Sequence, residues 1–217
     1  TRPFAHRQLL PQTVKYIASV IPEQSKEKLE TRLIKGAYIE NRYTQAHIPQ
    51  QYVIEYYLMY IFCFLALFAS IWVLRSLLSA IVQDKTVGTL GAMLFALIFP
   101  FFEVLGGYYY DIFEILFMFM AAHFAYHKRW LGLLLLTPIA EANKESFLFF
   151  LITLYPLTRM HFPVKKSAAL TLSTIFLAGI TYLYIRQLYA GNPGDMADWR
   201  IRDHMQTIFD LGSYFYT

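Results

Sequence analysis

The chain has 217 residues, of which 57% are hydrophobic and 16% charged, and its formal net charge is +4. Soluble domains usually carry about 25% charged residues, so this composition excludes an ordinary soluble protein. The basic residues form no dense run along the sequence, which argues against nucleic acid as a partner.

Residues 1–51 are amphipathic. Val14, Ile17 and Ile21 recur at helical spacing, and Pro22 ends that pattern. The stretch 25–35 then alternates charged and apolar residues. We expect two short extracytoplasmic helices that lie near lipid headgroups.

The central part of the chain, residues 52–187, is predicted to be a transmembrane helical domain. Tyr56–Leu74, Thr86–Phe102 and Ser167–Ile185 are runs of 19, 17 and 19 residues without a charge. A bilayer core about 30 Å thick needs roughly 20 apolar helical residues. The expected fold is an all-α, polytopic transmembrane helix bundle of about four full spans. Its apolar segments are residues 52–82, 86–102, 105–126, 130–157 and 167–185.

Basic residues in short loops predict which side of the membrane each loop occupies. The loops near residues 75–85, 127–129 and 159–166 carry Lys and Arg, so we expect them to be cytoplasmic. Both ends of segment 130–157 would then be cytoplasmic. We therefore expect a re-entrant helical hairpin; the alternative is one long tilted span, with the basic loop at residues 159–166 outside. Residues 188–217 are expected to be an extracytoplasmic tail that has lost residues, because the chain stops abruptly at Thr217.

Two acids interrupt the third apolar segment. Asp111 and Glu114 are three residues apart and so share a helix face. Ionisable groups in membrane segments usually face a cavity or a partner. We predict a catalytic carboxylate pair there; the alternative is acids that simply reach headgroup water.

A second polar group, residues 141–146, lies between two apolar stretches. Lys144 and Glu145 are candidate substrate-binding residues, and Lys144 has the charge to bind a phosphate. An unpaired ammonium would be costly there, so the alternative is that Lys144 pairs with Glu141 or Glu145 of its own segment.

Near the start of the chain, Arg2 and Arg7 are candidates for clamping a phosphate, or they contact lipid headgroups. His123 and His127 have the spacing of metal ligands, but no nearby third ligand appears. We therefore predict no metal site, and the sequence identifies no cofactor.

Three short patches, at residues 2–11, 107–111 and 142–146, together resemble a group of bacterial polytopic inner-membrane proteins. Their organisation is similar to that of the GT-C glycosyltransferases. The resemblance implies a polyprenyl-phosphate sugar as substrate at the extracytoplasmic face. It also implies a catalytic acid in the first external loop. The acids that remain there are Glu23, Glu27, Glu30 and Glu40, and none can be assigned.

The functional hypothesis is a glycosyltransferase-like protein of the bacterial inner membrane, with membrane lipids and the lipid-linked sugar as partners. Asp111 would act on the acceptor hydroxyl, while Arg7 and Lys144 would hold the phosphate. The first alternative is a non-catalytic subunit or scaffold with protein partners in a larger membrane complex. The second alternative is a transporter-like protein that uses the polar segment 141–146.

Overall fold

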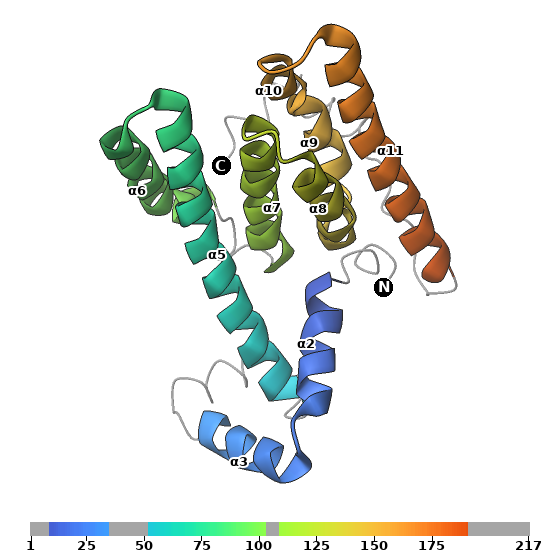
Figure 1. Cartoon of the computed structure of the whole chain (residues 1–217). Helices are drawn as coiled ribbons and strands as arrows, with labels where there is room; N and C mark the ends of the chain where they lie inside the picture. Colours follow the sequence, from blue (N-terminus) through green and yellow to red (C-terminus); the bar gives the residue numbers. More distant parts are fainter. Residues whose placement is uncertain (1–8, 35–51, 103–108, 191–217) are drawn as a thin grey trace, which may run out of the picture.

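The computed structural model describes residues 9–34, 52–102 and 109–190. Within these ranges the chain forms helices joined by turns, without a β-strand, so the expected all-α fold is confirmed (Figure 1). The helices are α2 (Leu9–Val20), α3 (Glu23–Ile34), α5 (Val53–Val82), α6 (Lys85–Phe102), α7 (Tyr109–Tyr126), α8 (Trp130–Asn143), α9 (Phe147–Thr153), α10 (Tyr155–Arg159) and α11 (Val164–Leu188).

The N-terminal helices α2 and α3 form as expected, and α3 begins directly after Pro22. Leu10, Val14 and Ala18, four residues apart, are buried along one face of α2. Leu10 and Val14 pack with Cys63 of α5, and residues of the first turn of α7 surround them. Protein therefore covers this face of α2.

Helices α5 and α6 form an antiparallel hairpin at one side of the bundle (Figure 1). Asp84 begins α6, because its Oδ1 accepts hydrogen bonds from the backbone N–H groups of Thr86 and Val87. Gly88 lies directly against the backbone of α5 at Ser79. A small residue at this position lets the two helices approach closely.

The segment 130–159 folds back on itself (Figure 1). Helix α8 ends at Asn143, a short turn follows, and α9 and α10 return along the bundle. Ring contacts between Tyr126 and His161, at 5.8 Å, and between Trp130 and Phe162, at 5.5 Å, bring the two ends of the segment together. One continuous span is therefore the wrong alternative, and the segment is a helical hairpin.

The two ends of the bundle can be named after α7. At the Tyr126 end, the Tyr126 hydroxyl donates a hydrogen bond of 2.9 Å to the carbonyl oxygen of Ala80, near the end of α5. At the Tyr109 end lie the start of α7, helix α2 and the turn between α8 and α9. The turns between α5 and α6, between α7 and α8, and between α10 and α11, with the basic residues in or beside them, are thus at the opposite end from Asp111.

The core lies between α7, α8, α9 and α11. Its buried residues are Phe117, Ala121, Leu133, Leu136, Ala140, Phe147, Leu151, Leu154 and Ala178. Large apolar side chains also cover the outward faces, for example Phe68 on α5 and Phe176 on α11, which are both more than half exposed. Such exposed apolar surface is typical of contact with lipid or another protein.

Two helices among the described residues, α5 and α11, are long and apolar enough to cross a membrane by length and composition. They indicate membrane association. Helices α6 and α7 have 18 residues each, and neither combines the length and the hydropathy that identify α5 and α11 as candidate spans. The expectation of about four full spans is therefore met only in part.

Candidate functional site

The first turns of α7 present the two acids that the sequence analysis selected. Asp111 lies in the first turn, where a carboxylate interacts favourably with the positive end of the helix dipole. Glu114 follows three residues later, so both side chains project from the same face. Asp111 is 26% exposed and Glu114 is 11% exposed, which places the pair at the edge of the packed core.

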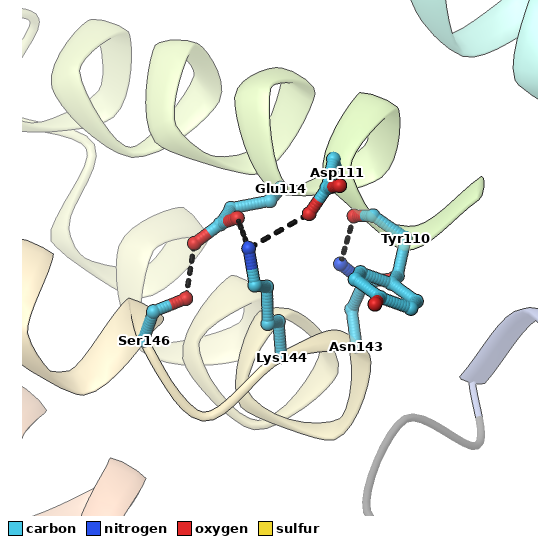
Figure 2. A network of polar contacts seen from close by, with 6 residues as sticks. All are labelled: Tyr110, Asp111, Glu114, Asn143, Lys144 and Ser146. Carbon is cyan, nitrogen blue, oxygen red and sulfur yellow. Dashed lines mark hydrogen bonds and ion pairs between the residues drawn. The ribbon is translucent and has the colours of Figure 1, made fainter. Parts of the chain in front are cut away.

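The turn after α8 supplies the cation. Lys144 leaves the helix in an extended backbone conformation, with φ −160° and ψ 132°, while its N–H still donates to the carbonyl of Ala140. This break carries the lysine side chain away from the axis of α8 and toward α7 (Figure 2). The polar interruption in the sequence is thus the point at which the chain reverses.

Lys144 joins the two predicted clusters. Its Nζ lies 2.7 Å from Oδ1 of Asp111 and 2.5 Å from Oε2 of Glu114. The same Nζ lies 5.6 Å from the centre of the Tyr110 ring (Figure 2). The sequence analysis expected Lys144 to pair with an acid of its own segment or with a phosphate. The structure instead pairs it with two acids from another helix.

Two further hydrogen bonds hold the turn against α7. The buried amide of Asn143 donates from Nδ2 to the backbone carbonyl oxygen of Tyr110, at 2.8 Å. The hydroxyl of Ser146 donates to Oε1 of Glu114 (Figure 2). Each contact joins the turn to the first two turns of α7.

The sequence analysis did not assign roles to Tyr110 or Ser146. Both lie in the short patches that carry the family resemblance, at residues 107–111 and 142–146, so those patches were the available signal. The partners of the Ser146 hydroxyl and the Tyr110 carbonyl are 32 and 33 residues away in the sequence, so only the tertiary structure identifies them.

The other two acids of the turn lie deeper or to the side. Glu141 is almost fully buried. Within the described part of the chain, neither of its carboxylate oxygens accepts a hydrogen bond of good geometry. The backbone amide of Leu148 lies near enough to interact with the carboxylate. Glu145 is half-buried and close enough to Glu141 for their charges to interact. Among the described residues, the acids that form ion pairs with Lys144 are Asp111 and Glu114.

The remaining candidates do not join this site. Arg2 and Arg7 lie outside the described residues. The rings of His123 and His127 are tilted by 48° with their centroids 4.4 Å apart, and His123 Nε2 lies 3.1 Å from the Ser76 hydroxyl. They lie toward the Tyr126 end, and the described residues hold no group of three His, Cys, Asp or Glu side chains arranged to bind a metal ion.

The site as a whole carries one ammonium and two carboxylates, all partly open to the surroundings. The lysine offsets one of the two negative charges of this cluster. Such a site can accept a proton from a neutral hydroxyl or attract a cation. Comparison of the chain with models of protein families, with curated proteins and with solved structures finds no match.

Proposed function

We propose that this chain is a multi-pass protein of the bacterial inner membrane that transfers a sugar from a polyprenyl phosphate at its extracytoplasmic face. In this proposal α5, α6, α7 and α11 are spans, and α8 to α10 form a re-entrant hairpin. The supporting features are the exposed apolar helix faces and the basic residues in the turns of the Tyr126 end.

The depth of the hairpin supports this arrangement. Helix α8 has 14 residues, which corresponds to about 20 Å at 1.5 Å per residue. If the Tyr126 end is cytoplasmic, the turn at Lys144 lies in the outer half of a hydrocarbon core about 30 Å thick. Polar backbone at that depth is tolerated where protein buries it, and the contacts of Asn143 and Ser146 to α7 do this.

The observation that carries the transfer proposal is the convergence of Asp111, Glu114 and Lys144 from two segments at the Tyr109 end. A lipid-linked donor carries its sugar–phosphate bond among the outer headgroups, and in this proposal the Tyr109 end faces that side of the membrane. Asp111 is the most exposed of the three side chains, so an acceptor hydroxyl can approach it.

The chemistry of transfer balances with these groups. The acceptor oxygen forms a bond to the anomeric carbon of the sugar, and the bond from that carbon to the phosphate oxygen breaks. The polyprenyl phosphate leaves with the bonding electrons, and Asp111 takes the proton of the hydroxyl. Lys144 lies next to Asp111 and supplies positive charge toward the departing phosphate.

The test is turnover of a polyprenyl-phosphate sugar by the purified protein in lipid nanodiscs. Asp111→Asn should abolish transfer while donor binding persists, because the amide keeps the shape and loses the basic oxygen. Asp84→Asn removes one exposed carboxylate at the Tyr126 end, far from the site, while asparagine can still cap α6, so it is the matched control. Equal turnover by the wild type and Asp111→Asn would remove Asp111 from the mechanism.

A non-catalytic scaffold is the second candidate, favoured by one specific observation. Lys144 is already paired with two carboxylates, and this network alone would hold the hairpin on α7. Under this alternative no preparation shows turnover, and a stable partner co-purifies. Substitutions at Asp111 would then alter the thermal stability of the protein without altering any transfer reaction.

A further inference from the structure

The Tyr126 end of the bundle carries six exposed basic side chains, which we call the basic end. They are Lys85, Lys128, Arg129, Arg159, Lys165 and Lys166. They lie in or beside three turns, which join α5 to α6, α7 to α8, and α10 to α11. In these turns the sequence holds a single acid, Asp84.

Contacts within the protein gather these turns at one surface. Tyr126 links the end of α7 to Ala80 near the end of α5. The same tyrosine ring meets His161 in the turn before α11. Trp130 and Phe162 connect the starts of α8 and α11. The basic end is therefore a single surface of the folded chain.

Protein groups do not neutralise these charges. Within the described ranges, none of the six side chains forms an ion pair with a carboxylate. Arg159 donates from Nη1 to the carbonyl oxygen of Phe162, at 2.5 Å, and Lys166 Nζ lies 4.2 Å from the centre of the Phe162 ring. Both contacts leave the positive charge in place.

Three of these residues also lie where their charges oppose the helix dipoles. Arg129 is the N-cap of α8, and Lys165 and Lys166 lie in the first turn of α11. Cations at a helix N-terminus are unfavourable, because that end already carries partial positive charge. Helix α6 begins with an acidic cap, Asp84, which complements the positive end of its dipole. By contrast, no side chain caps the first turn of α8 or α11 with a hydrogen bond. The charges of Arg129, Lys165 and Lys166 therefore do not stabilise the helices that they begin.

We propose that the basic end is a docking surface for the anionic phosphodiester headgroups of the lipid leaflet on that side. Headgroup phosphates complement both the basic side chains and the uncapped starts of α8 and α11. The aromatic rings of Tyr126, Trp130 and Phe162 lie beside the charges, at the level where aromatic belts contact lipid headgroups. This inference rests on the placement of the bundle in a membrane and is independent of sugar transfer.

The test uses the intact protein in vesicles of phosphatidylcholine with a variable fraction of phosphatidylglycerol. Trp130 is the reporter, after Trp72→Phe and Trp199→Phe remove the other two tryptophans. Dibrominated phosphatidylglycerol should quench its fluorescence at lower mole fractions than dibrominated phosphatidylcholine does. The preference should decrease as the salt concentration rises, because salt screens exposed charges.

The critical variant is Arg129→Gln/Lys165→Gln/Lys166→Gln. Each basic residue near an anionic surface changes affinity about fivefold, so the preference for phosphatidylglycerol should fall by about a hundredfold or to the level of phosphatidylcholine. The control, Lys15→Gln/Lys28→Gln/Arg32→Gln, removes the same charge from exposed positions on α2 and α3. It should keep the preference of the wild type.

Three results would overturn the inference. They are equal quenching by both brominated lipids in the wild type, equal losses in the two triple variants, and displacement of the lipid by soluble glycerol phosphate. The last result would identify a site for a free phosphate compound. Stable insertion with no lipid preference would refute the docking surface while leaving the proposed membrane placement intact.

Discussion

Lys144 and Asp111 form an ion pair with an Nζ to Oδ1 distance of 2.7 Å, although 33 residues separate them in the sequence. The pair joins the turn of the α8–α9 hairpin to the first turn of α7. Glu114 shares the same ammonium group, so one cation holds two carboxylates that would otherwise repel each other. This arrangement makes Lys144 the residue on which the geometry of the site depends.

We expect Lys144→Gln to lower the thermal stability of the protein in detergent. The change leaves Asp111 and Glu114 facing each other without a counter-charge. Losing one partner of a fully buried pair costs about 3–5 kcal/mol. Partial exposure of these side chains reduces the expected loss to about 1–3 kcal/mol.

The neutral triple variant Asp111→Asn/Glu114→Gln/Lys144→Gln separates charge from shape. It should recover most of the stability lost in Lys144→Gln, because no uncompensated carboxylate remains. Thermal unfolding of both variants, measured by the same fluorescence assay, checks this. A triple variant as unstable as the single one would show that packing of the lysine, rather than its charge, holds the turn.

Asn143→Leu tests the second link between the turn and α7. The substitution leaves the backbone carbonyl of Tyr110 without the amide donor that it contacts at 2.8 Å. Loss of a buried hydrogen-bond partner costs about 1–3 kcal/mol. We expect a lower unfolding temperature and faster proteolysis between α8 and α9. A wild-type proteolysis pattern would mean that Lys144 and Ser146 suffice to hold the turn.

Gly88 and Gly91 should differ in their tolerance of a methyl group. A Cβ at Gly88 would lie 2.8 Å from the backbone nitrogen of Ser79, which cannot move away without shifting α5. A Cβ at Gly91 would lie 2.7 Å from Cδ1 of Leu78, a side chain that can change rotamer. Overpacking typically costs about 1–3 kcal/mol. Gly88→Ala should show such a loss, and Gly91→Ala a smaller one.

The yield and thermal midpoint of both alanine variants in detergent provide the measurement. Gly179 on α11 has no atom within 4 Å of an added Cβ, so Gly179→Ala is the matched control and should remain close to the wild type. Equal behaviour of Gly88→Ala and Gly179→Ala would show that the contact between α5 and α6 is looser than this structure has it.

The proposed topology predicts which side of the membrane can label introduced cysteines. After Cys63→Ala, cysteines at Lys128 and Lys165 should react only with a reagent supplied to the cytoplasmic side. A cysteine at Ser25, an exposed position on α3, should react from the outside. Labelling of the Lys165 variant from outside would contradict a re-entrant hairpin, since both of its ends must lie on the same side.

Much of the secondary structure could be predicted from the sequence. The length of the charge-free runs and the proline at position 22 predicted α2, α3, α5, α6 and α11 to within a few residues. These features are local, because helix formation depends on neighbours three or four residues away. The same spacing placed Asp111 and Glu114 on one face of α7, which their shared contact with Lys144 confirms.

The sequence by itself therefore determined the helices, the apolar character of their surfaces and the two polar interruptions at residues 111–114 and 141–146. Only the tertiary structure decided that Lys144 reaches Asp111 and Glu114, and that the amide of Asn143 meets Tyr110. An isolated lysine can pair with any acid within reach, so local spacing favoured Glu141 and Glu145. The turn between Tyr126 and Trp130 brings α8 against α7 in antiparallel orientation, so the end of α8 lies beside the start of α7, and this packing selects the partners.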